Sequence, residues 1–448
     1  MKICVINGSP KGDFSVTLQS VLYLNKLFDD CEFDIINAGM QIKKFEKDFS
    51  LPKEKLENCD IVLFSYPVYT FIAPAQLHRF IELIKENKVL LENKFVSQIS
   101  TSKHFYDVTA HKYIEENCYD LNMKYVHGLS CDMEDLLSDK GRSELEKFFN
   151  FLIYSYKNNI YETRLIKQIN FNDYIKTGNS KLHSDPKYKV AIVCDLKEND
   201  QKLKTMIDDF ENNFPYETKI VNIHNFAFQG GCLGCFNCAG SGKCIYKDGF
   251  DDYLREEINS CDGIVIAFTI KDHSMGARFK LYDDRQFCNG HRTVTEGKPF
   301  AYIINGDYQN EENLRLIIEG RAEVGGNYLS GCITDANSLI QTINKFTYAL
   351  ENHYVKPRTF YGVGGMKIFR DLIWVMRGIM KADHVFYKKH GVYDFPQKQR
   401  GRMILMCLLG SMIRNPKIKS KMGNKFNEGM LAPYKKVLNK TKEKEKSK

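Results

Sequence analysis

Four cysteines stand close together in the second half of the chain. Cys232, Cys235, Cys238 and Cys244 lie in the stretch GGCLGCFNCAGSGKCIY, residues 230–246, with a Cys-x2-Cys-x2-Cys-x5-Cys spacing. Thiolates spaced in this way can hold a [4Fe–4S] cluster, because the short steps wrap three ligands around one face of the cube. The glycine-rich spacer then lets the fourth ligand reach it. Structural zinc usually draws on two separated ligand pairs, and a Cys-x2-Cys can act as a redox dithiol. We favour the cluster, and both alternatives remain open.

A second candidate site lies near the start of the sequence. The run KICVING is followed by NGSPKGDFSVT, residues 7–17, in which Gly8 permits a tight turn. Ser9, Ser15 and Thr17 offer hydroxyl and backbone N–H groups. A helix that begins near Ser15 would point its N-terminus at whatever the loop encloses, and unpaired N–H groups and the helix dipole attract a phosphate there. The same residues could equally form a plain strand–turn–helix connection with a serine N-cap.

Both candidate sites stand among strands and helices that alternate along the chain. Short apolar runs predict strands, and helix-period segments follow them. Such alternation indicates βαβ units and a parallel sheet. The predicted strands lie at 2–8, 58–69 and 94–100 in the first half and at 189–195, 260–271 and 299–305 in the second. The similar order predicts a duplicated unit, with the cysteine loop in an interval that is longer in the second copy.

The phosphate loop and the segment SYPVYTFIAPAQLHRFIELI, residues 65–84, resemble the NADPH-dependent FMN reductases, a flavodoxin-like family. The resemblance implies that the Gly-Ser-Pro-Lys loop holds the FMN phosphate. It also implies that the Pro-Val-Tyr turn lies against the isoalloxazine ring, with Tyr69 as a flat face and Pro67 stiffening the turn. The loop after the next strand would touch the ring as well. The residues assigned to FMN in this way are Ser9, Lys11, Ser15, Thr17, Pro67, Val68, Tyr69, Thr70, Thr101 and Ser102.

The cysteine loop, continuing as GCLGCFNCAGSGKCIYKDGFDDYL, resembles that of the iron–sulfur flavoproteins. In that family flavin and cluster meet across a contact between two identical subunits. Here the phosphate loop occurs only in the first copy and the cysteine loop only in the second. The corresponding loop of the second copy reads CDLKENDQK, where Asp195 and Glu198 would repel a phosphate. We therefore expect an internal pseudo-dimer, with one FMN and one cluster facing each other within one chain.

Composition and charge narrow the range of partners. With 43% hydrophobic and 27% charged residues the chain is typical of a soluble globular protein. Residues 356–448 hold 23 Lys and Arg against 6 Asp and Glu, so the rest of the chain is mildly acidic. That distribution argues against a nucleic-acid partner for the body. A strand at 2–8 predicts no secretory signal, and hence a cytoplasmic location with reduced cysteines.

The C-terminal part of the chain follows a different pattern. MKIFRDLIWVMRGIMKADHVF, residues 366–386, has apolar residues at helical spacing with basic residues between them. RMILMCLLGSMI, residues 402–413, is apolar but too short for a bilayer span, which needs about 20 residues. These helices could pack on the body or lie on an anionic membrane surface. We prefer packing, because apolar stripes more often face a core.

Together these observations predict an α/β protein with two tandem flavodoxin-like, doubly wound parallel-sheet domains. The predicted domains span 1–165 and 186–355, joined by a linker around 179–188 and followed by a basic helical extension, 356–448.

The predicted function is that of an FMN-dependent NAD(P)H oxidoreductase. A nicotinamide would reduce the flavin, which would pass electrons to the cluster or to a small-molecule or protein acceptor. The alternative is a flavodoxin-like electron carrier without its own NAD(P)H site, in which the four cysteines are redox thiols or a zinc site. Assembly into a homo-oligomer remains open.

Overall fold

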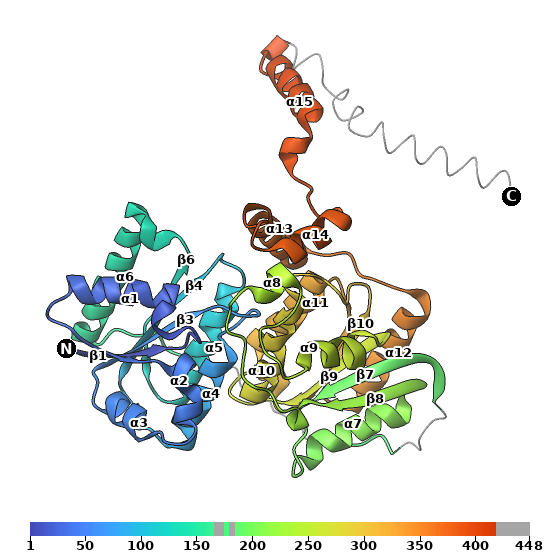
Figure 1. Ribbon diagram of the computed structural model, residues 1–448, viewed down its shortest axis with the longest axis horizontal. Helices are drawn as coiled ribbons and strands as arrows, with labels where there is room; N and C mark the ends of the chain where they lie inside the picture. Colours follow the sequence, from blue (N-terminus) through green and yellow to red (C-terminus); the bar gives the residue numbers. More distant parts are fainter. Residues whose placement is uncertain (165–173, 179–183, 418–448) are drawn as a thin grey trace. The chain divides into compact units, whose positions relative to one another are not determined.

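The computed structural model describes residues 1–164, 174–178 and 184–417. The chain divides into two compact units, Met1–Tyr387 and Lys388–Lys448. The first unit contains two parallel β-sheets, which differ in colour in Figure 1 because each comes from one half of the sequence.

The first sheet has the strand order β2-β1-β3-β4-β5, and β6 also pairs with β4. All of its paired strands run parallel. Its strands are β1 (Lys2–Asn7), β2 (Glu32–Ile36), β3 (Ile61–Pro67), β4 (Phe95–Ser102), β5 (Lys124–Tyr125) and β6 (Leu129–Asp132). Its helices are α1 (Val16–Leu27), α2 (Ala38–Phe45), α3 (Ser50–Glu57), α4 (Ala75–Glu86), α5 (Asp107–Asp120) and α6 (Asp139–Asn158). The buried side chains of α1 and α6 pack on one face of the sheet. The phosphate loop connects β1 to α1 and therefore lies at the carboxyl end of β1.

The second sheet repeats this order, because β8-β7-β9-β10-β11 corresponds to β2-β1-β3-β4-β5 strand by strand. Its strands are β7 (Asp185–Cys194), β8 (Tyr216–Asn222), β9 (Gly263–Thr269), β10 (Pro299–Asn305) and β11 (Tyr328–Ile333). Its helices are α7 (Gln201–Asn213), α8 (Asn237–Ser241), α9 (Phe250–Tyr253), α10 (Gly276–Arg285), α11 (Glu312–Gly325) and α12 (Ala336–Asn352). The two parallel α/β sheets confirm the predicted fold class.

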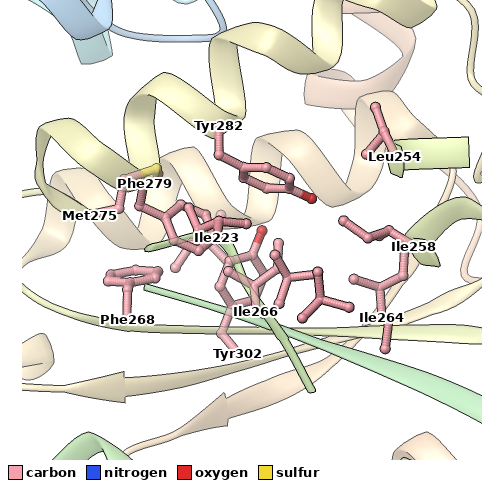
Figure 2. Close-up of a cluster of buried hydrophobic side chains, with 14 of the residues drawn as sticks. Ile223, Leu254, Ile258, Ile264, Ile266, Phe268, Met275, Phe279, Tyr282 and Tyr302 are labelled. Atoms are coloured by element: carbon pink, nitrogen blue, oxygen red, sulfur yellow. The ribbon is translucent and has the colours of Figure 1, made fainter. Parts of the chain in front are cut away.

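Apolar clusters cover both faces of the second sheet. On one face Leu203 of α7 and Phe346 of α12 belong to the same buried cluster. On the other face Figure 2 shows the rings of Phe279 and Tyr282, from α10, over Ile266 of the sheet. Burial on both faces explains why the strands read as continuous apolar runs in the sequence.

The predicted linker is only partly a linker. β7 begins at Asp185, so the last residues of the stretch 179–188 already belong to a strand. The polar residues that suggested a loop pair there with the edge strand β8, since Asp185 aligns with Tyr216. Residues 179–183 lie outside the described part of the chain, and the predicted domain boundaries stay a prediction.

The C-terminal extension is helical, as predicted. It contains α13 (Phe360–Val375), α14 (Lys381–Lys389) and α15 (Arg400–Ile413). α13 packs on α11, where the Glu323 carboxylate accepts hydrogen bonds from the N–H groups of Thr359 (2.8 Å) and Gly362 (3.1 Å). Within the described residues, no helix is long and apolar enough to cross a membrane. The final segment NKTKEKEKSK, for which we predict a solvated run, lies outside the described residues.

Equivalent helices of the two halves pack on each other. α4 follows the third strand of the first half and α10 follows the third strand of the second, and the two are in contact. Glu82 on α4 accepts a hydrogen bond from the N–H of Ala277 (2.8 Å) and pairs with Lys271 (2.9 Å). Lys85 on the same helix pairs with Asp272 (2.7 Å). The two halves are thus joined by polar contacts, of which the hydrogen bond from Ala277 to Glu82 is buried.

A histidine bridges the two halves near these contacts. His273, in the loop after β9, lies 2.9 Å from Asp120 on α5 through Nε2 and 2.9 Å from Glu311 through Nδ1. Burial lowers the pKa of His273, but the hydrogen bonds to the two carboxylates outweigh burial and raise the pKa to about 9. A raised pKa means that protonated His273 stabilises the folded protein.

His273→Gln should therefore destabilise the protein in a pH-dependent way. The loss should be on the order of 3 kcal/mol below pH 6.5, and it should shrink to nothing as pH rises through 9. Urea unfolding midpoints at pH 6, 8 and 10 measure it. The matched control is His224→Gln, because His224 pairs with Asp195 (2.9 Å) with a 40% exposed side chain. An exposed pair contributes about 0–1 kcal/mol, so a pH-independent loss in His273→Gln would contradict the account.

Candidate functional site

One cavity of about 440 Å³ lies in the first unit. Its walls come from the phosphate loop, the turn after β3, the end of β4, the cysteine loop, the segment after α10 and helix α13. Its volume is within the usual range for a small-molecule site. All fourteen residues predicted from the sequence line it: Ser9, Lys11, Ser15, Thr17, Pro67, Val68, Tyr69, Thr70, Thr101, Ser102, Cys232, Cys235, Cys238 and Cys244. The structure therefore brings the two candidate sites together, although they lie more than 200 residues apart.

The phosphate loop ends in a helix N-terminus, as predicted. α1 begins at Val16, and the side chain of Ser15 accepts a hydrogen bond from the N–H of Leu18 (3.4 Å). The N–H groups of Val16 and Thr17 donate to no other group in the described part of the chain. Both residues line the cavity. Two unpaired N–H groups at a helix N-terminus, with Lys11 nearby, fit a phosphate.

The turn after β3 differs in one respect from the expectation. We expect backbone groups of Val68 to Thr70 to reach the flavin ring edge. The N–H of Val68 donates to Thr101 (3.1 Å), and that of Tyr69 donates to Ile72 (2.8 Å), so both are already used. Among these three residues only the N–H of Thr70 has no acceptor in the described chain. Thr70 also has a φ of 43°, in the left-handed region that is costly for a side chain of this shape.

The second half of the chain holds this turn in place. The Lys280 ammonium donates to the carbonyl of Tyr69 (3.0 Å), and the Asp284 carboxylate accepts from the Thr70 hydroxyl (2.7 Å). The N–H of Ala75, at the start of α4, donates to the other oxygen of Asp284 (2.8 Å). Lys280 and Asp284 are ion-paired and fully buried. These contacts explain how the strained turn is maintained.

A second ion pair completes the network. Arg321 on α11 donates to the carbonyl of Thr70 (3.0 Å) and pairs with Asp283. Burial raises the pKa of Asp284, whereas for Asp283 the charges of Arg321 and Lys280 outweigh burial and lower the pKa. Sequence reasoning missed this network. Its signal in the sequence, the charged run at 283–285, is what a solvent-exposed helix would also show.

The cysteine loop directly contacts the side of the cavity that the phosphate loop and the turn after β3 form. Gly234 has a φ of 60°, and a Cβ at this position would overlap the hydroxyl of Tyr69. The Lys11 ammonium lies 5.7 Å from the centre of the Phe236 ring, and the Gln76 amide donates to the carbonyl of Cys232 (3.4 Å). Thus a loop from the second half meets the phosphate loop and the aromatic turn of the first.

The four cysteines of this loop all line the cavity. Burial is the main cause that raises the pKa of the Cys232 thiol. Burial also raises the pKa of the Cys238 thiol, to about 11, and the negative charge of Asp383 contributes to that rise. Within the described residues, no three His, Cys, Asp or Glu side chains are grouped so that they could hold one metal ion. The ligands of one zinc ion surround a single point, whereas the four thiolates of a [4Fe–4S] cluster each bind a different iron and therefore lie further from one another.

The base of the cysteine loop is fixed by a buried arginine. Arg285, at the end of α10, donates to the carbonyl of Gly230 (2.9 Å) and pairs with Asp248 (2.8 Å). Its guanidinium also lies 4.5 Å from the centre of the Tyr246 ring. Both ends of the loop are therefore tied to α10, the helix that also carries Lys280 and Asp284.

In the second half, the loop that corresponds to the phosphate loop forms hydrogen bonds with side chains of the same half. Asp200 caps α7 by accepting from the N–H of Leu203 (3.2 Å), and it accepts from the Thr269 hydroxyl (2.7 Å). The N–H of Leu196 donates to Asn222 (3.1 Å). The N–H groups of Leu196 and Leu203 are therefore paired with side chains of the second half itself.

Comparison with known proteins agrees with this geometry. Residues 1–128 match the family model of the NADPH-dependent FMN reductases, so the resemblance seen in the first half is confirmed. An iron–sulfur flavoprotein of Clostridioides difficile (strain 630) is 26% identical over 141 residues, which are 28% of this chain and 61% of that protein. The chain thus matches about three fifths of the length of this curated relative.

Solved structures show weaker likeness. An NADH:FMN oxidoreductase in its apo form is 18% identical, covering 34% of this chain and 89% of that chain, with a TM-score of 0.31. An FMN-dependent NADH-azoreductase from Bacillus anthracis, in complex with FMN, is 12% identical, covering 36% of this chain and 100% of that chain, with a TM-score of 0.27. Likeness at this level indicates no function for this chain.

Proposed function

We propose that the protein is an FMN-dependent NAD(P)H oxidoreductase with one flavin site and one [4Fe–4S] site in a single cavity. The observation that carries this proposal is the cavity, because the phosphate loop, the aromatic turn and all four cysteines line it. The match of residues 1–128 to FMN reductases supports the flavin. The curated relative supports the cluster through its description as an iron–sulfur flavoprotein.

The residues present fit FMN. The N–H groups of Val16 and Thr17 and the ammonium of Lys11 would hold the phosphate. Tyr69 would lie flat against the ring, and the Thr70 N–H would meet its polar edge. The Ser102 hydroxyl, buried and without a partner among the described residues, lines the same cavity. When bound, the flavin supplies the chemistry of accepting a hydride and releasing electrons.

The spacing of the four cysteines along the chain suits a cluster better than a single zinc ion. Burial at Cys232 and Cys238 favours uncharged groups. Coordination to iron removes the charge penalty of burying a thiolate. Because Gly234 lies against Tyr69, a cluster held by the cysteine loop would lie next to a flavin held by the phosphate loop. Electron transfer between the two requires such a short distance.

The internal pseudo-dimer is part of this proposal. It is supported by the packing of α4 on α10, because an isologous dimer also joins equivalent elements of its two copies. A cytoplasmic location is proposed as well, since all fourteen cysteines are free and reduced thiols persist in reducing compartments.

Anaerobic titration of the purified holoprotein tests the oxidoreductase function. Stepwise addition of NADPH or NADH should bleach the visible absorbance of the flavin, and an added acceptor should restore it. An electron carrier without a nicotinamide site would be bleached by dithionite but by neither nucleotide. That result would contradict the proposed function and favour the carrier.

A further inference from the structure

A buried carboxylate orients a histidine in the wall of the cavity. His291 lines the cavity, and its Nδ1 lies 2.9 Å from Oδ2 of Asp383 on α14. The same oxygen accepts from the His291 backbone N–H (3.2 Å). Asp383 is fully buried, and Arg292 lies 3.4 Å from its other oxygen. Because Nδ1 is engaged, Nε2 is the ring nitrogen of His291 that bonds to no described residue.

The C-terminal extension builds this arrangement. The Tyr387 hydroxyl donates to the carbonyl of His291 (3.1 Å), and the Phe369 ring of α13 lies 4.8 Å from the imidazole. Gly290 has a φ of 62°, and a Cβ there would overlap the Asp383 carboxylate. Phe369 also lines the cavity. The imidazole is therefore held on several sides and faces the same space as the flavin residues.

We propose that His291 is the proton donor to the electron acceptor, with Asp383 as its positioning residue. The proposal rests on the proposed function, which supplies the reductant. Reduction of a quinone by two electrons adds one hydride and one proton. The hydride comes from the flavin that the nicotinamide has reduced, and it converts the quinone to a hydroquinone anion. The Nε2–H bond of protonated His291 breaks, its proton goes to the anionic oxygen, and neutral His291 then takes a proton from water.

The fixed geometry is what this role requires. A general acid contributes when its proton is held within hydrogen-bond reach of the group that receives it. A buried carboxylate on the far nitrogen fixes the ring orientation and offsets the charge of the imidazolium, as in other His–Asp pairs. No local pattern in the sequence indicates this pair, because its two members are separated by 92 positions and one lies in the C-terminal extension.

The test compares two acceptors on the His291→Gln holoprotein. The flavin is reduced with dithionite without oxygen and reoxidised with 1,4-naphthoquinone or with ferricyanide, which takes single electrons and no proton. We expect quinone reduction to slow by about 100-fold and ferricyanide reduction to stay unchanged. Asp383→Asn should slow quinone reduction in the same selective way. His224→Gln, an Asp-paired histidine outside the cavity, should change neither rate.

A binding measurement accompanies the kinetics. Equilibrium dialysis measures naphthoquinone binding to the oxidised holoprotein. We expect the dissociation constant to change less than twofold in His291→Gln, because the loss is in proton transfer. Equal slowing with both acceptors, unchanged quinone reduction, or a loss explained by weaker binding would overturn the proposal. Since dithionite replaces the nicotinamide, a protein that fails to use NADPH would contradict only the proposed function.

A second surface stands out in the unit Lys388–Lys448. α15 has the sequence RGRMILMCLLGSMI, without an acidic residue. Six of its large apolar side chains are about half exposed or more: Met403, Ile404, Leu405, Met406, Leu408 and Met412. Contiguous apolar surface of this kind marks an interaction site.

We propose that α15 lies on an anionic lipid bilayer. Residues 388–448 carry 17 Lys and Arg against 4 Asp and Glu, which favours a negatively charged surface as the partner. Arg400 and Arg402 precede the apolar run and Arg414 follows it, so the basic groups flank the part that would enter the interface. Fourteen residues are too few to span the bilayer, and an interfacial helix needs no such length.

Sedimentation of the full chain with lipid vesicles tests this proposal. The protein should bind vesicles of phosphatidylglycerol at least tenfold better than vesicles of phosphatidylcholine, and high salt should weaken binding. The double variant Leu405→Glu, Leu408→Glu should lose at least tenfold in binding. The control Leu137→Glu changes an 80% exposed leucine of the first unit and should bind normally. Equal binding of the double variant, no vesicle binding, or self-association that the double variant abolishes would overturn the proposal.

Discussion

Replacing Asp284 by asparagine should lower the free energy of unfolding by about 3–5 kcal/mol, because it breaks a buried ion pair. Lys280, Thr70 and Ala75 all direct donors at this carboxylate. An amide in its place would turn an NH₂ group toward a donor and would leave Lys280 with less compensating charge. The turn at Tyr69 would lose its support, so FMN affinity should fall as well. Urea unfolding and fluorescence titration of FMN measure the two effects.

The control for this prediction is Asp252→Asn. Asp252 has a side chain that is 79% exposed and lies 3.6 Å from Arg255, so its removal should cost about 0–1 kcal/mol. If Asp284→Asn kept both the stability and the FMN affinity of the wild type, the buried network could not be what holds the turn.

Gly39→Ala should be the most damaging small substitution for FMN binding. Gly39 lies on α2, and a Cβ there would overlap the backbone of Gly8 and Ser9. Backbone atoms cannot rotate away, so the phosphate loop must shift. Overpacking of this kind costs about 1–3 kcal/mol, which corresponds to about 5- to 150-fold in FMN affinity if the loop bears the strain.

The matched control is Gly364→Ala in α13, where a Cβ meets no other atom within 4 Å. A glycine-to-alanine change at an open helical position should leave the protein equally or slightly more stable. The FMN dissociation constants of the two variants, measured by fluorescence, check the contrast. Wild-type affinity in Gly39→Ala would show that the loop does not hold the phosphate.

The sequence alone predicts the fold well, for physical reasons. The strands are buried on both faces, so KICVING and PFAYIIN read as continuous apolar runs. Helix α1 has a serine N-cap and a lysine in its last turn, the local signals that define helix ends. The start of β7 is missed because its first residues, Asp185 to Tyr188, are exposed or half-buried and do not form an apolar run.

The candidate site is predictable only in part. Loops at the carboxyl ends of strands carry local motifs, and these locate the phosphate loop, the aromatic turn and the cysteines. The supporting residues have no such motif. Lys280 and Asp284 stand on a helix with so many charges that its burial cannot be foreseen, and Arg321 meets them only in the tertiary structure. His291 and Asp383 belong to segments that no local pattern connects.

The measurement that tests the central claim most directly is the content of FMN, iron and acid-labile sulfide per chain after anaerobic purification. We expect one FMN with about four iron and four sulfide. Cys238→Ser should lower iron and sulfide while FMN stays near one per chain. FMN without iron or sulfide would contradict a shared flavin–cluster cavity and would leave the four cysteines as thiols or a zinc site. Two FMN per chain would equally contradict the single phosphate site.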